Sequence, residues 1–224
     1  MSSLVLAAAV ALVLGGVVVV ALPALLRALP RPADQSEPWS YASAGGPAFR
    51  WAAGGISAVA SFAALGSSDP RWWLAWAALS APGVVLAAID ARTGYLPRRL
   101  TWAAYAVAAA GVVVGCAVGG DAGAALAPAI GSVVGGGVLW GLWHLGFGLG
   151  FGDVRLAALI GLVAGTGDVT VAMWSLAAGG LIGAIQGAVR RLALKHRGAY
   201  PFGPALVAGA FAVAIVDAVV GTVS

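Results

Sequence analysis

Eight long apolar runs, separated by short polar segments, make up most of this 224-residue chain. A helix needs about 20 mostly apolar residues to cross a bilayer, and all the runs but the sixth approach that length. We expect the short sixth run to be tilted, extended by the glycine loop before it, or sheltered inside the bundle. The pattern predicts an all-α, polytopic membrane helix bundle with about eight transmembrane helices, at roughly 3–27, 50–67, 71–89, 100–119, 124–147, 153–166, 169–189 and 203–221.

The composition excludes an ordinary soluble domain. Hydrophobic residues make up 61% of the chain and charged residues 9%, and the mean hydropathy is +0.98. Soluble domains carry about 25% charged residues. The 34 glycines fit helices that approach one another closely. No Lys or Arg precedes the first run, which is longer than a signal-peptide core, so we expect a retained first helix.

The basic residues predict how the chain is oriented in the membrane. With the N-terminus outside, eleven of the twelve Lys and Arg residues fall in cytoplasmic segments, and only Arg71 falls outside. This split agrees with the positive-inside rule. It explains the net charge of +4 and the pI of about 9.8 without nucleic acid, and we expect no nucleic-acid partner. The same orientation places Asp90 and Asp153 together at the cytoplasmic face.

Polar residues in the first half suggest a division of the chain. The longest polar stretch, 30–49, is rich in Pro, Ser, Ala and Gly and is expected to be a cytoplasmic linker. We therefore assign residues 1–70 to an N-terminal pair of transmembrane helices with this linker, and residues 71–224 to a core that carries the chemistry.

Asp90 and Asp153 are the candidate catalytic residues, because each lies at the edge of an apolar run. A carboxylate at membrane depth costs roughly 2.5–3.5 kcal/mol on insertion scales. Asp90 falls at the C-terminal end of a predicted helix, where the helix dipole disfavours it, so helix stability does not explain it. For Asp153 a structural alternative is helix capping, since Asp is a favoured N-cap. Two carboxylates that share a proton can serve as base and acid in amide hydrolysis.

No other set of residues competes for a catalytic role. Cys116 stands alone in an apolar run, which excludes an internal disulfide and a cysteine cluster. His144 lies among tryptophans and His196 in a basic loop, and no paired-histidine spacing is present. We expect neither a metal nor a cofactor.

Three motifs, in order, give the chain its resemblance to a known family. Asp90, with Pro97 and Thr101 after it, resembles the first motif of the type IV prepilin peptidases, which are GxGD intramembrane aspartyl proteases. Gly150-Phe151-Gly152-Asp153-Val154-Arg155-Leu156 is similar to their second motif, and Pro201-Phe202-Gly203-Pro204 to the element before their final helix. The resemblance covers roughly residues 75–215.

The resemblance implies an endopeptidase with Asp90 and Asp153 as its catalytic pair. Such enzymes cut the leader from type IV prepilins and pseudopilins at the cytoplasmic membrane face, and their substrates carry a short basic leader, commonly ending in Gly, before a hydrophobic helix. Gly150 and Gly152 would allow a tight turn and close approach of the peptide backbone. Pro97 and Arg155 would support the site or the substrate. Arg155 stands where the family usually has Lys, so it keeps the positive charge but not a transferable proton.

A second departure from the family concerns the linker. Many bacterial members carry a cysteine-rich cytoplasmic segment there and also N-methylate the new pilin N-terminus, whereas residues 30–49 contain no cysteine. We therefore expect a peptidase-only form without zinc and without methyltransferase activity. The excess of Arg over Lys and the abundance of Ala, Gly and Val suggest a GC-rich bacterial genome, and we expect a multi-pass protein of the bacterial inner membrane.

Three alternatives remain open at the level of sequence. A proton-coupled transporter would use the same two aspartates as relay sites, with acidic residues near the membrane midplane and related halves. A presenilin- or signal-peptide-peptidase-like protease shares the GxGD chemistry, but those families resemble a Tyr-Asp first site where this chain has Ile89-Asp90. A non-enzymatic membrane scaffold is the third.

Overall fold

The computed structural model describes residues 3–30, 41–192 and 200–221. Over these residues the chain is helical and contains no strand. The helices are α1 (Ser3–Ala28), α2 (Pro47–Ser67), α3 (Trp73–Ala78), α4 (Val84–Thr93), α5 (Arg98–Gly119), α6 (Leu126–His144), α7 (Phe151–Ala164), α8 (Val169–Leu192) and α9 (Gly203–Gly221). Short helical turns, η1 (Tyr41–Ala44), η2 (Pro70–Trp72), η3 (Leu79–Gly83) and η4 (Ala122–Ala125), lie between them.

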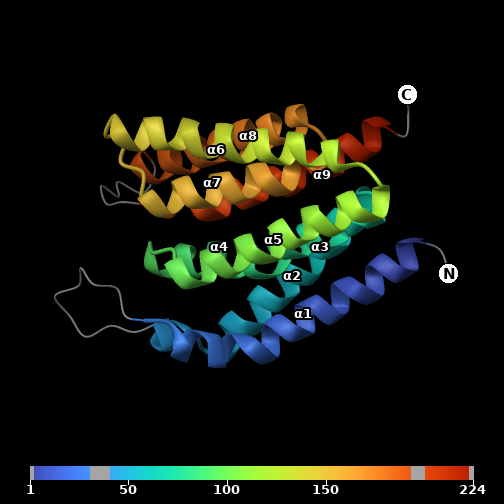
Figure 1. The fold of residues 1–224 in the computed structure, drawn as a ribbon. Helices are drawn as coiled ribbons and strands as arrows, with labels where there is room; N and C mark the ends of the chain where they lie inside the picture. The colour runs from blue at the N-terminus through green and yellow to red at the C-terminus, as the bar shows by residue number, and fades with distance from the viewer. Residues whose placement is uncertain (1–2, 31–40, 193–199, 222–224) are drawn as a thin grey trace.

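The predicted all-α polytopic bundle is confirmed. Six helical spans of the described chain are long and apolar enough to cross a membrane: 3–28, 47–67, 70–93, 98–119, 122–144 and 169–192. The third of them joins η2, α3, η3 and α4 into one span. The two shorter helices, α7 and α9, lie with these spans in the same bundle (Figure 1).

The short α7 lies at the centre of the bundle. It contacts α5, α6, α8 and α9, and its residues Leu156, Leu159, Ile160 and Val163 are completely buried. Close packing on α6 depends on glycine, because a Cβ at Gly161 would meet the backbone of Gly131. Of the three explanations for the short run, this burial supports shelter inside the bundle.

The helices form two groups that meet along α4, α5, α7 and α9. In Figure 1, α6, α7, α8 and α9 lie together above α1–α5. Contacts of α4 and α2 with α9, and of α5 with α7, join the groups. The two helices that carry Asp90 and Asp153, α4 and α7, thus come from opposite sides of this junction.

A π-helical turn interrupts the third span just before the helix of Asp90. It covers Leu79–Gly83 and contains Pro82, which has no N–H to donate. The carbonyl of Ser80 accepts a hydrogen bond from Ser57 Oγ of α2 at 2.6 Å, and Ser61 Oγ donates to Ser80 Oγ at 2.8 Å. A π turn adds about one residue to the helical repeat, so it changes the direction in which every later side chain points. The direction of Asp90 therefore depends on this turn.

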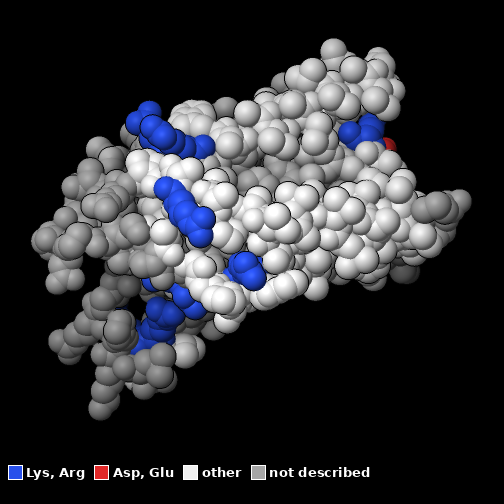
Figure 2. All heavy atoms as spheres, turned by 90° about the horizontal axis from the view of Figure 1, so that it is seen from below, with Lys and Arg blue, Asp and Glu red and all other residues white. Residues whose placement is uncertain are grey.

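The two ends of the bundle differ in charge. The described arginines other than Arg71 lie at the ends of helices that meet at one end of the molecule, here called the basic end: Arg27, Arg50, Arg92, Arg98, Arg99, Arg155, Arg190 and Arg191. Figure 2 shows basic side chains gathered at one end of this face, with a long uncharged surface between them and the charged side chains at the other end. Asp69, Asp121, Asp168 and Asp217 lie toward the opposite end. Among described carboxylates, only Asp90 and Asp153 are at the basic end.

Several predicted features fall outside the described residues. Arg31, Lys195 and Arg197, which contributed to the predicted charge split, are among them, and so are His196 and residues 31–40 of the predicted linker. The remainder of that linker contains η1, and α2 begins at Pro47.

Candidate active site

Asp90 is buried near the end of α4, with a relative exposure of 4%. Gly94 ends this helix in a left-handed conformation (φ 68°), and its N–H donates to the carbonyl of Asp90. The carboxylate itself accepts a hydrogen bond at Oδ2 from the backbone N–H of Gly203, at 2.8 Å. Asp90 is therefore held from two sides, by its own helix end and by the start of α9.

Asp153 is buried in the first turn of α7, with a relative exposure of 7%. It does not occupy the N-cap position, which belongs to Gly150, because the helix begins at Phe151. The Asp153 carboxylate reaches back and accepts a hydrogen bond at Oδ2 from the Gly150 N–H at 2.9 Å. Asp153 therefore does help to begin the helix, from its third position, while its second carboxylate oxygen takes no part in this bond.

The glycines in and before the second motif have distinct structural roles. The left-handed turns of the loop between α6 and α7 are made at Gly146 (φ 78°) and Gly148 (φ 77°). Gly150 has an extended conformation that any residue can adopt (φ −81°, ψ 150°). Gly152 is required for packing, because a Cβ there would lie 2.8 Å from Leu96 Cβ. That contact holds the start of α7 against the turn that follows Asp90.

Both aspartates line one cavity of about 550 Å³ at the basic end. Its walls come from three segments that are distant in sequence: the turn after α4, the loop before α7, and the approach to α9. The lining residues are Asp90, Gly94, Tyr95, Leu96, Phe147, Gly148, Leu149, Gly150, Phe151, Gly152, Asp153, Arg155, Tyr200 and Phe202. Two buried carboxylates in one cavity provide the groups for general acid and base chemistry.

Tyr200 reports the electrostatic character of this cavity. Its hydroxyl donates a hydrogen bond to the carbonyl of Gly183 at 2.9 Å. Burial raises the pKa of the Tyr200 phenol, and the negative charge of Asp153 raises this pKa further. Tyr200, in the segment that leads into α9, therefore lies close enough to Asp153 of α7 for its phenol to interact with that charge.

Arg155 and Pro97 lie at the edge of the site. The Arg155 guanidinium lies over the Phe151 ring, 5.6 Å from its centroid, and makes no ion pair with Asp90 or Asp153 in the described structure. Pro97 is buried and caps α5, where its carbonyl accepts hydrogen bonds from the N–H and Oγ1 of Thr101, both at 3.0 Å. Pro97 thus fixes the turn that returns from Asp90, and does not line the cavity.

Sequence reasoning missed Gly203, Tyr200 and Phe202 as site residues. The available signal was the Pro201-Phe202-Gly203-Pro204 element, whose two prolines set the start of α9 and leave the Gly203 N–H to donate outward. The acceptor of this N–H, Asp90 Oδ2, is known only from the packing of α9 against α4, which the sequence does not show.

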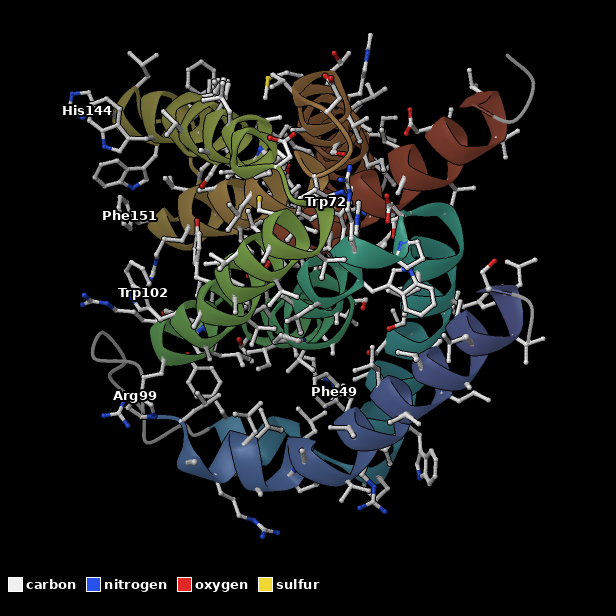
Figure 3. The ribbon with its side chains drawn as sticks, turned by 45° about the vertical axis from the view of Figure 1, so that its right-hand side comes forward. Phe49, Trp72, Arg99, Trp102, His144 and Phe151 are labelled. Carbon is white, nitrogen blue, oxygen red and sulfur yellow. The ribbon has the colours of Figure 1, made fainter. Side chains whose placement is uncertain are left out.

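Histidine and cysteine lie away from this site. His144 is exposed at the end of α6 and stacks on Trp140, with ring centroids 5.4 Å apart. Figure 3 shows His144 projecting from the outside of the bundle, as Arg99 does, whereas Phe49 points inward. Cys116 is a half-buried free thiol in α5. Within the described residues, no three His, Cys, Asp or Glu side chains gather as a metal site requires.

A larger recess, of about 720 Å³, lies between α8 and α9 and is apolar apart from Asp168, Thr170 and Asp217. Neither Asp90 nor Asp153 lines it. Its size alone therefore does not mark it as the reaction site, because acid–base chemistry needs titratable groups that converge.

The fold and the site together define a multi-pass membrane protein with two buried carboxylates in a shared cavity at one end of its helix bundle. Comparison with models of known protein families matches residues 77–188 to the Type IV leader peptidase family. The chain belongs to this family and is a membrane peptidase. No curated protein and no solved structure matches the chain. The family match includes Asp90 and Asp153 and ends before Gly203.

Proposed function

We propose that this protein is an aspartic endopeptidase that removes the leader of type IV prepilins or pseudopilins, with Asp90 and Asp153 as its catalytic pair. One observation supports this most directly: both carboxylates are buried in the same cavity, and each is held by a backbone N–H of a glycine at Oδ2. This arrangement leaves Oδ1 of each aspartate for water or for the substrate.

In the proposed reaction, one aspartate is ionised and the other is protonated. The ionised carboxylate takes a proton from water as the water oxygen attacks the scissile carbonyl carbon. The protonated carboxyl group gives its proton to the carbonyl oxygen, which produces a neutral tetrahedral intermediate. The aspartate that took the proton from water then gives it to the amide nitrogen, while the other carboxylate takes a proton from one hydroxyl of the intermediate. The C–N bond breaks, and the acid and the amine are released. No covalent intermediate forms.

The charge distribution supports cleavage at the cytoplasmic face of the bacterial inner membrane. The basic end holds eight of the nine described arginines and both aspartates, and the positive-inside rule places such an end in the cytoplasm. With eight membrane-crossing helices, both termini are then outside. We further propose that residues 71–224 form the peptidase core, because every residue that lines the site cavity belongs to them.

The described carboxylates fit a proton-coupled transporter less well. All six, Asp69, Asp90, Asp121, Asp153, Asp168 and Asp217, lie in loops or within about one turn of a helix end. A transporter of this kind places its carboxylates near the membrane midplane. The peptidase is therefore the function that we propose.

The decisive experiment compares Asp90→Asn and Asp153→Asn with Asp168→Asn in a cleavage assay. An amide keeps the size of the carboxylate and an acceptor for the glycine N–H, so both site variants should remain in membranes at normal levels and should not process a co-expressed prepilin. Asp168 is exposed at the opposite end, and its amide variant should cleave like the wild type. Cleavage by either site variant would refute the catalytic pair, and inhibition by a metal chelator would indicate a metallopeptidase.

A further inference from the structure

An apolar recess lies next to the chain segments that carry Asp90 and Gly203, on the membrane-facing side of the bundle. It has a volume of about 220 Å³ and is formed where α2, α4 and α9 meet; we call it the α2–α4–α9 groove. Its lining includes Ala87, Ala88, Ala91, Pro204, Ala208 and Phe211. None of the residues that line the groove is polar or charged. An occupant of the groove must therefore be apolar.

The groove begins at the level of the reacting carboxylate. Ala91 follows Asp90 in α4, and Pro204 follows Gly203, whose N–H holds Asp90 Oδ2. From there the groove runs along the helices toward the middle of the membrane. On α9 it extends from Pro204 to Phe211, which are seven residues apart, or about 10 Å of helix. An occupant would therefore lie parallel to the spans, with one end at Asp90.

The walls of the groove suit a helix as occupant. Ala87, Ala88 and Ala91 supply the α4 wall and Ala208 part of the α9 wall, and small side chains allow two helix backbones to approach closely in a membrane. The groove is open to the side, since Ala208 is exposed and Ile56 on the α2 wall is 58% exposed. An apolar helix could enter from the lipid without crossing the basic end.

We propose that the α2–α4–α9 groove binds the first two turns of the hydrophobic helix of the substrate. The proposal rests on the proposed peptidase function and names where the enzyme holds its substrate. Leader cleavage requires that the peptide bond before an apolar helix reach the aspartates. A groove that starts at Asp90 and runs into the membrane for about two turns meets that requirement. It also gives α2, which lies outside the proposed core, a part in substrate recognition.

The test uses the full-length protein in vesicles with a single-span substrate whose basic leader ends in glycine before an apolar helix. Ala208→Leu and Ala88→Leu each fill the groove, and Ala109→Leu, on the exposed face of α5, is the matched control. Filling a binding groove removes ground-state affinity, so both groove variants should raise KM by roughly tenfold or more with kcat within about twofold of the wild type. The control should keep both constants.

A cross-linking measurement makes the test independent of turnover. A benzophenone amino acid is placed at position 208 or at position 109 in the Asp153→Asn background, so that the substrate stays intact. We expect substrate adducts from position 208 and only background from position 109. Adducts at 208 together with active Asp90→Asn and Asp153→Asn variants would support the groove and refute the catalytic pair. The proposed binding of substrate in the groove would be overturned if position 208 cross-linked only to lipid and Ala208→Leu left KM unchanged. If the aspartate variants were inactive in that case, the catalytic pair would still stand.

Discussion

The backbone N–H of Gly203 donates a hydrogen bond to Asp90 Oδ2 at 2.8 Å, across 113 residues of sequence. This bond connects the end of α4 to the start of α9 and satisfies one oxygen of a buried carboxylate. A hydrogen bond to a charged group is worth about 1.5–3 kcal/mol, which offsets part of the cost of burying it. The position of Asp90 is therefore set by a residue from the last helix of the bundle.

The first prediction concerns Gly203. A Cβ at this position would lie 2.8 Å from Asp90 Oδ2 and 3.3 Å from Asp90 Cγ, so Gly203→Ala must displace the carboxylate. Misplacing a catalytic group by about 1 Å costs about 100-fold in rate, and we expect a loss of that order in a cleavage assay. Gly180→Ala is the control, because a Cβ at Gly180 of α8 would meet no atom within 4 Å. Equal activity of the two variants would contradict the proposed role of Gly203.

The second prediction separates the two glycines of the Gly150-Phe151-Gly152-Asp153 motif. Gly152→Ala would place its Cβ 2.8 Å from Leu96 Cβ, and such overpacking typically costs about 1–3 kcal/mol. In Gly150→Ala the nearest atom to the new Cβ is Asp153 Oδ2 at 3.5 Å, an ordinary contact, and the N–H that binds Asp153 is retained. Thermal unfolding in detergent should therefore show Gly152→Ala destabilised and Gly150→Ala close to the wild type. If Gly150→Ala were instead the less stable variant, packing of Gly152 on Leu96 would not determine the stability of this segment.

The third prediction concerns Arg155. Its guanidinium lies over Phe151, and an exposed cation–π contact is worth about 0.5–1 kcal/mol, which corresponds to roughly two- to fivefold in rate or affinity. We expect Arg155→Lys to cleave like the wild type and Arg155→Gln to lose no more than that factor in kcat/KM. A loss of about 100-fold in Arg155→Gln would show instead that the charge acts on the reacting groups.

The fourth prediction is a pH dependence of stability through Tyr200. Because burial and then the charge of Asp153 raise its pKa, the folded protein holds this proton more tightly than the unfolded chain does. This contribution to stability is complete below the ordinary tyrosine pKa of about 10 and is lost as the pH rises through the higher pKa of the folded state. The unfolding temperature should therefore fall less between pH 8 and pH 11 in Tyr200→Phe than in the wild type. Equal falls would exclude Tyr200 as a contributor.

The overall architecture follows from the sequence because apolar length is a local property. A run such as 100–119 must be a helix to satisfy its backbone in lipid, and the helix Arg98–Gly119 is found there. Gly94 ends α4 because it can adopt the left-handed conformation, and Pro97, with its restricted φ, precedes the first residue of α5. The distribution of Arg along the chain also predicts which helix ends lie together.

The site was predictable in part. Asp90 and Asp153 could be singled out because carboxylates beside apolar runs are costly and are seldom kept without use. The helix start at Phe151 was not predictable from the favoured capping role of Asp, since Asp153 bonds to the N-cap N–H from the third position. The left-handed turns at Gly146 and Gly148 were not predictable either, because many glycines in this chain look alike in sequence.

The sequence by itself determined the helices, the gathering of basic residues at one end of the bundle, and the two aspartates that a membrane chain seldom keeps without a use. The tertiary structure alone decided that Gly203 holds Asp90, that Gly152 packs on Leu96, and that an apolar groove includes Ala91 and Pro204, which follow Asp90 and Gly203 in the chain. The physical reason is that hydrophobic length and charge act along the chain and can be read locally. A hydrogen bond or a close approach between residues distant in sequence exists only once the helices are packed.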